Sequence, residues 1–189
     1  MRYRTALTWP TLTVQWFPDV KEPEGKNYRM HRLLLGTHTS DDSTNYLQIA
    51  DVQIPKAVAP NPDNYDEERG EIGGYGNSGD VAAIKCDIVQ KIEHPSEVNK
   101  ARYQPQNPDI IATLCVDGRI LIFDRTKHPL QPANPGKINP QIELVGHKAE
   151  GFGLNWNPHE AGCLASGSED KTMCLWYAQI SDTFKPQNK

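Results

Sequence analysis

Short apolar runs, each closed by a polar or turn-forming stretch, recur along the second half of the chain. The runs are 110–114, 120–123, 153–156, 163–166 and 173–176. Runs of four or five residues bounded by Gly, Pro, Asn and Asp indicate strands rather than helices. Between the first two runs, Asp117-Gly118 is a strong hairpin signal because this pair supplies the positive φ angles of a tight turn. The pattern predicts an all-β chain of short antiparallel strands.

The same pattern occurs twice, 53 positions apart, with no gap between the matched positions. The matched pairs are His94/His147, Glu97/Glu150, Tyr103/Trp156, Pro105/Pro158, Thr113/Ser166, Asp117/Asp170 and Phe123/Trp176. A weaker third copy lies upstream, where 33–37 and 46–50 are the expected strands. Repeated units that cannot bury their apolar face alone stack on one another.

The repeat divides the chain into three units joined by long loops. We expect a first partial unit at 6–52, an acidic and Gly-rich loop at 53–80, a second unit at 81–125, a Pro-rich loop at 126–140, a third unit at 141–177 and a separate tail at 178–189.

Composition narrows the protein class. The 189 residues include 15 Pro and 14 Gly and are 37% hydrophobic, which favours many short elements over a few long helices. No apolar run approaches the roughly 18 residues of a membrane span, and no apolar segment follows Met1-Arg2 as in a secretion signal.

Charge and cysteine spacing exclude two kinds of chemistry. The net charge of -4 argues against direct nucleic-acid binding but permits a basic partner. The four cysteines, Cys86, Cys115, Cys163 and Cys174, have no zinc-type spacing, so we expect small buried residues in a reducing compartment.

The third unit resembles a WD repeat. Gly146-His147, the string LASGSEDKT at 164–172 and Leu175-Trp176 carry the resemblance, while Tyr177 replaces the usual Asp. The resemblance implies a β-propeller blade with a hydrogen-bonded tetrad of His147, Ser166, Asp170 and Trp176. In the second unit His94, Thr113 and Asp117 are expected to do the same, without the last link because Phe123 has no N–H.

Longer strings resemble one family within this class, the histone-binding WD40 proteins. These are the retinoblastoma-binding or Msi-type subunits of chromatin assembly factor 1 and of the type B histone acetyltransferase. The strings are ALTWPTLT at 6–13, LGTHTS at 35–40, EVNKARYQPQNP at 97–108, FDRTKHP at 123–129 and GFGLNWNP at 151–158. The resemblance covers residues 6 to about 176 and looks fungal. Since family members have seven blades, it implies an incomplete propeller of about three.

The resemblance also implies a site. Family members bind the histone H3 tail with acidic side chains near the central channel, and the positions that match are Glu97, Asn99, Glu150 and Phe152, with His38 nearby. A carboxylate opposite Arg or Lys forms charge-assisted hydrogen bonds, and an aromatic ring can stack on the cation. Glu97 and Glu150 are equivalent positions of the repeat, and an ordinary solvated loop charge is the alternative for both.

As partners, the resemblance implies histone H3 and subunits of chromatin assembly, acetyltransferase, deacetylase or methyltransferase complexes, in the nucleus, with the cytoplasm as a second location. It implies no enzymatic activity, cofactor, metal or membrane. Histone H4 binds family members between an N-terminal helix and a late acidic loop; this sequence contains neither, so H4 binding is not expected. Thr8 stands where the family has Glu, which weakens the acidic surface.

Two other functions stay open. Residues 74–79 match GxGxxG, but a dinucleotide site needs a strand before and a helix after the motif, and here an acidic turn precedes it and a strand at 81–89 is expected after it. A WD40 scaffold for a non-histone partner, such as a ubiquitin-ligase adaptor, is the second candidate. Those adaptors often carry Arg two residues after the Trp-Asp pair, and neither repeat has it.

Three units cannot close a ring of seven blades, and an open ring exposes unpaired strand edges. We therefore expect a fragment or variant product that is poorly stable in isolation, with a mobile loop at 55–79.

Overall fold

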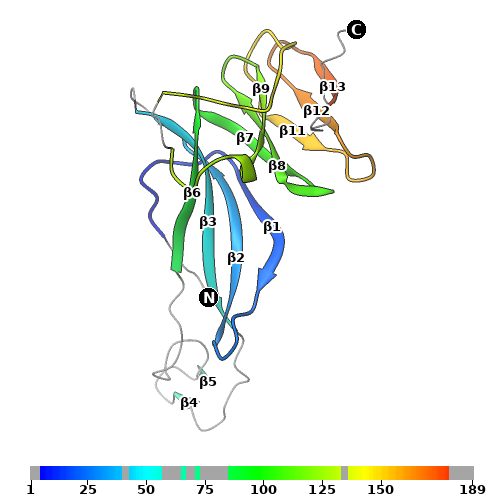
Figure 1. Cartoon of the computed structure of the whole chain (residues 1–189). Helices are drawn as coiled ribbons and strands as arrows, with labels where there is room; N and C mark the ends of the chain where they lie inside the picture. Colours follow the sequence, from blue (N-terminus) through cyan, green and yellow to red (C-terminus); the bar gives the residue numbers. More distant parts are fainter. Residues whose placement is uncertain are drawn as a thin grey trace.

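A computed structural model describes residues 5–39, 43–56, 65–66, 71–72, 85–132 and 136–178. Three antiparallel sheets account for most of these residues, which confirms the predicted all-β class (Figure 1). The described residues contain no α-helix, only the 3-10 turn η2 (Arg125–Lys127). The GxGxxG motif, most of the loop at 55–79 and the tail from 179 lie outside the described residues.

The first sheet has four strands in the order β1-β2-β3-β6. They are β1 (Val14–Lys21), β2 (Tyr28–Gly36), β3 (Asn45–Pro55) and β6 (Lys85–His94). The expected strands at 33–37 and 46–50 are the inner parts of the long β2–β3 hairpin, which extends well beyond the other sheets in Figure 1. Two short strands, β4 (Tyr65–Asp66) and β5 (Glu71–Ile72), pair only with each other.

The second and third sheets contain the two clear copies of the repeat. The second sheet has the order β10-β9-β8-β7, with β7 (Val98–Gln104), β8 (Asn107–Cys115), β9 (Ile120–Asp124) and β10 (Ile142–Leu144). The third has the order β11-β12-β13, with β11 (Gly153–Trp156), β12 (Cys163–Gly167) and β13 (Met173–Tyr177). The five apolar runs of the repeat therefore all lie in strands.

The sheets do not follow the unit boundaries expected from the repeat. β6 opens the second unit in sequence but is the outer strand of the first sheet, where it pairs with β3. In the same way β10 opens the third unit but pairs with β9 of the second sheet. Each unit thus begins by completing the sheet before it, and this exchange links neighbouring sheets through the chain itself.

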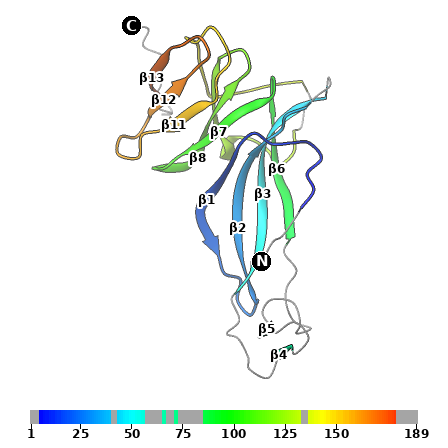
Figure 2. The same cartoon turned by 180° about the vertical axis from the view of Figure 1, so that it is seen from behind.

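The second sheet lies between the other two and is buried on both faces (Figure 2). Ile111 and Phe123 pack towards the first sheet with Leu34, Leu47 and Ile49. The alternate residues Ile110, Ala112 and Ile122 pack towards the third sheet with Leu154 and Trp156. Because successive side chains of a strand point to opposite faces, a strand covered on both sides is apolar at every position. This explains the unbroken apolar run of β8.

The β8–β9 turn differs in detail from the expected hairpin. Of Asp117-Gly118 only Gly118 has a positive φ, at 84°, and its N–H donates to the carbonyl of Cys115. The turn is therefore a longer loop that ends in one left-handed residue, not a two-residue turn with two such residues. The equivalent turn of the third sheet has the same bonds, with Lys171 at a φ of 69°.

The four cysteines are free, with Cys115 and Cys163 buried. Burial raises the pKa of the Cys115 thiol to about 12, so it stays protonated. No helix among the described residues is long and apolar enough to cross a bilayer.

Candidate functional site

A chain of hydrogen bonds joins four residues of the third unit. His147 Nδ1 lies 3.3 Å from Asp170 Oδ2, and His147 Nε2 lies 2.7 Å from Ser166 Oγ. The Trp176 indole N–H donates to the same Ser166 oxygen at 2.7 Å. Because an ionised carboxylate only accepts, Nδ1 carries the imidazole proton and Ser166 donates to Nε2. The single Ser166 hydroxyl is thus the hydrogen-bond partner of both His147 Nε2 and the Trp176 indole N–H.

The Asp170 carboxylate, which ends this chain of hydrogen bonds, accepts further hydrogen bonds from its neighbours. Hydrogen bonds from the Thr172 hydroxyl and the Lys148 backbone N–H hold the pKa of Asp170 well below its usual range. Thr172 Oγ1 also lies 3.1 Å from His147 Nδ1. The carboxylate therefore stays ionised and fixes the turn before β13.

The second unit builds this chain differently, which corrects the expectation for Asp117. His94 Nε2 lies 2.9 Å from Thr113 Oγ1 as expected, but His94 Nδ1 donates to the Ser96 carbonyl at 2.7 Å. Asp117 instead accepts from Arg119 Nε at 2.6 Å. The Ser96 backbone carbonyl replaces the carboxylate as the acceptor for His94. Because every residue has a backbone carbonyl, the pattern of side chains could not predict this bond.

Burial lowers the pKa of His94 to about 4, against an ordinary value of 6.5. The imidazole is therefore neutral near pH 7, which suits a core position that donates at Nδ1 and accepts at Nε2. Neither repeat histidine is placed as a base or a metal ligand, and no group of three metal-type side chains occurs among the described residues.

The five residues expected to bind a partner lie at one end of the sheets, and four of them form two contacting pairs. His38 Nδ1, just after β2, lies 3.5 Å from Glu97 Oε1, just before β7. Asn99 Nδ2, on β7, donates to Glu150 Oε2 at 3.2 Å and to the Gly151 carbonyl at 3.3 Å, ahead of β11. We call His38, Glu97, Asn99, Glu150 and Phe152 the acidic surface; it crosses all three sheets.

Close backbone packing fixes the segment that carries Glu150. A Cβ on Gly151 would come within 2.2 Å of the Gly167 carbonyl oxygen, and one on Gly118 within 2.6 Å of the Ala149 carbonyl oxygen. The Ser168 hydroxyl also reaches the Glu150 carbonyl at 3.0 Å. The segment is thus held between the turns of the second and third sheets, and Ser168 gave no signal in the sequence beyond its place in the repeat.

The side chains of the acidic surface differ in solvent exposure: one is buried and the others are partly exposed. Asn99 is buried at 3% and Phe152 is 48% exposed. The side chains of His38 and Glu97 are 40% and 32% exposed. Two partly open carboxylates and an exposed ring can contact a cationic chain, whereas the Asn99 side chain is buried and hydrogen-bonded to Glu150.

Comparison with known proteins adds the family. Residues 1–56 match the family described as histone-binding protein RBBP4 or a subunit of the CAF1 complex. Histone acetyltransferase type B subunit 2 of Gibberella zeae is 87% identical over 174 residues, which is 92% of this chain. Over nearly all of its own length, the chain is therefore similar to histone-binding WD40 proteins. The same protein of Neurospora crassa is 68% identical over 93% of the chain, and that of Aspergillus fumigatus 62% over 96%.

This chain spans about 40% of the length of these fungal family members. Among solved structures, the WD40 domain of Toxoplasma gondii coronin matches 87% of this chain and 37% of that chain, at 18% identity and a TM-score of 0.43.

Proposed function

We propose that the protein is a non-catalytic subunit of nuclear chromatin complexes and binds the cationic tail of histone H3 on the acidic surface. The observation that carries the proposal is the pair of contacts that join His38 to Glu97 and Asn99 to Glu150 across neighbouring sheets. It gathers carboxylates of two neighbouring sheets at one end of a chain that is similar to histone-binding WD40 proteins. The name of the relatives, histone acetyltransferase type B subunit 2, supports a histone partner.

The chemistry favours a peptide that carries Arg or Lys. Each carboxylate can accept charge-assisted hydrogen bonds, and Phe152, two residues after Glu150, offers an exposed ring. Glu150 is pre-oriented by Asn99, which lowers the entropy lost on binding. Glu97 instead faces His38, so a bound cation has to share this carboxylate with the imidazole or replace it.

Titration of the chain with a labelled H3 N-terminal peptide tests the proposal. We expect Glu97→Gln and Glu150→Gln each to weaken binding by about 1–3 kcal/mol, roughly 5- to 150-fold, because the amide keeps the shape but loses the charge. Phe152→Ala should weaken binding less. Glu24→Gln, an exposed glutamate in the β1–β2 turn, serves as the matched control.

If both glutamate variants bind the peptide as tightly as Glu24→Gln does, the acidic surface is not the H3 site. If the unmodified chain does not bind the H3 peptide but retains another protein from nuclear extract, the non-histone scaffold is favoured instead.

A further inference from the structure

Part of the Pro-rich loop lies along the free edge of the first sheet. Gln90 Nε2 donates to the carbonyls of Arg125, His128 and Pro129 at 2.9, 3.1 and 3.4 Å. The Lys91 backbone N–H donates to the Leu130 carbonyl at 2.9 Å. The described residues of 125–141 form what we call the edge loop. It covers backbone groups of β6 that would otherwise be open to pairing.

A second anchor shapes the other end of this loop. The Gly136 N–H donates to both oxygens of Glu93, at 2.8 and 2.9 Å, and Glu93 is only 9% exposed. The one carboxylate at this place is therefore already engaged by the loop. No residue pattern had singled out Gln90 or Glu93.

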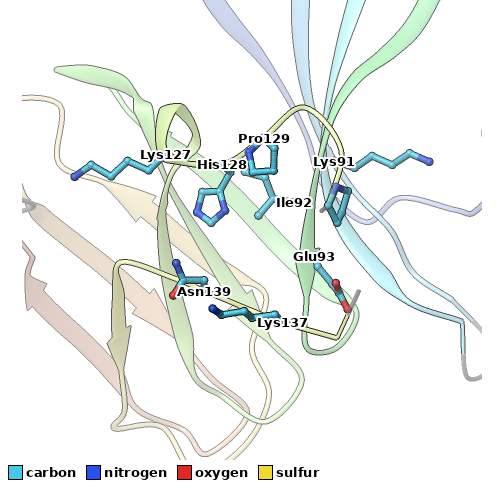
Figure 3. Close-up of a pocket in the computed structure, with 9 residues that line it drawn as sticks. Lys91, Ile92, Glu93, Lys127, His128, Pro129, Lys137 and Asn139 are labelled. Carbon is cyan, nitrogen blue, oxygen red and sulfur yellow. The ribbon is translucent and has the colours of Figure 1, made fainter. Parts of the chain in front are cut away.

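Between the two anchors the edge loop and β6 enclose a pocket of about 170 Å³ (Figure 3). This is far more than the roughly 10–15 Å³ that one water needs. Ile92, Pro129 and Pro132 supply apolar walls. His128, Asn139 and Lys137 supply polar groups that project towards the same opening in Figure 3.

Two polar side chains of the pocket, Lys137 and Asn139, are available to a ligand. Lys137 and Asn139 are exposed, and neither forms a hydrogen bond or ion pair with another residue of the described part of the chain. His128 is held in place, edge-on to Phe123 at 5.6 Å between ring centroids and 3.4 Å from Gln141 Oε1. The Lys137 ammonium and the Asn139 amide are donors that suit a carboxylate, and the fixed His128 ring forms a wall beside them.

Further cationic and apolar side chains flank the pocket. Lys127 and Lys91 line the pocket and extend from it in opposite directions in Figure 3. Leu130, in the same loop, is 66% exposed. In a protein of net charge -4, this local excess of cations beside apolar residues reverses the overall charge.

We propose that this pocket is a docking site for an extended acidic segment of a partner protein, with one Asp or Glu side chain inserted next to Lys137, Asn139 and His128. Neighbouring acidic residues of the segment lie towards Lys127 and Lys91, and an apolar residue packs on Leu130 and Pro129. Among the described residues that line the pocket, only His128 has an aromatic ring, so the pocket favours a peptide over single-stranded nucleic acid. This site is separate from the acidic surface and has the opposite charge preference.

Fluorescence anisotropy with a labelled Glu-Glu-Leu-Glu-Glu peptide and the full 189-residue chain tests the proposal. We expect saturable binding that weakens as salt rises, and about tenfold or weaker binding of the Gln-Gln-Leu-Gln-Gln peptide. Lys137→Glu should weaken binding of the acidic peptide about tenfold, with Lys137→Gln intermediate. Lys26→Glu, in the exposed β1–β2 turn, makes the same change of net charge and should leave binding unchanged.

Because Lys137 is exposed and pairs with none of the described residues, its variants should keep the melting curve of the unmodified chain, and their affinity for the H3 peptide should not change. Equal effects of Lys137→Glu and Lys26→Glu would overturn the proposal. So would equal binding of both peptides, or displacement of the acidic peptide by inorganic phosphate or a single-stranded oligonucleotide at matched charge concentration.

Discussion

At the scale of single residues, His94 and His147 show how one position of a repeat can keep its role with different partners. Both reach a hydroxyl through Nε2, Thr113 in one unit and Ser166 in the other. At Nδ1, His147 faces an ionised carboxylate, whereas His94 faces the carbonyl of Ser96. The buried His94 imidazole therefore has no negatively charged hydrogen-bond partner, whereas His147 has one.

This difference makes the stability of the protein depend on pH through His94. The unfolded chain binds a proton to this imidazole at about pH 6.5, and the folded chain only at about pH 4. The neutral imidazole's contribution is therefore complete above pH 6.5 and is lost as the pH falls towards 4. Between pH 7 and pH 5 we expect the free energy of unfolding to fall by roughly 2 kcal/mol from this group alone.

Urea unfolding at both pH values measures this loss, and His94→Gln should remove most of it. His159→Gln, at an exposed position, should retain the loss, since all other titrating groups are shared. A His94→Gln protein with the parent's full pH dependence would show that His94 is not the group responsible.

At the scale of elements, the hydrogen-bond chain of the third sheet joins the loop before β11 to β12, β13 and the turn between them. Ser166 is its centre, because its single oxygen accepts from Trp176 and its proton goes to His147. In the second sheet Phe123 takes the place of Trp176 and packs near His94, at 6.2 Å between ring centroids. The Trp176–Ser166 hydrogen bond of the third sheet thus has no counterpart at Phe123.

Ser166→Ala should lower the free energy of unfolding by about 1–3 kcal/mol, because it leaves His147 Nε2 and the indole N–H without partners. Trp176→Phe, which mimics the second sheet, should cost less because His147 and Ser166 stay bonded. Chemical denaturation of both variants and of the double variant measures the coupling. The double variant should cost less than the two separate losses added together, and simple additivity would contradict a shared network.

At the scale of the whole molecule, the sheets are coupled to their neighbours in series. Phe17 of the first sheet stacks on Tyr103 of the second, at 5.2 Å between ring centroids. The Trp156 indole of the third sheet donates to the Arg102 carbonyl of the second at 2.9 Å. In such an arrangement stability is a sum of local terms and of interfaces between neighbours.

Trp156→Ala should therefore loosen the third sheet selectively. Trp156 is 2% exposed, so truncation should cost about 3–5 kcal/mol at the interface with the second sheet. Hydrogen exchange followed by mass spectrometry should show faster exchange at 153–178 and little change at 28–55. Trp16→Ala, at a 49% exposed position of β1 in the first sheet, should change exchange little. Uniform acceleration along the chain would contradict series coupling.

Much of this protein followed from its sequence. Apolar runs of four to five residues between turn residues determined the strands, since a strand's period and length are local properties. The exact 53-residue repeat determined that Glu97 and Glu150 occupy equivalent places, and that His147, Ser166, Asp170 and Trp176 share one unit. The strings at 97–108 and 151–158 indicated the resemblance to histone-binding WD40 proteins before any fold was known.

Other features were decided only by tertiary structure. The sheet that a strand joins depends on which edge is free, so β6 and β10 complete the sheets before their own units. Asp117 is recruited by Arg119 because a backbone carbonyl, which has no sequence signature, already satisfies His94. The contact of Asn99 with Glu150 and the pocket beneath the edge loop arise between segments far apart in the chain, and pairing at that range is fixed by packing rather than by local pattern.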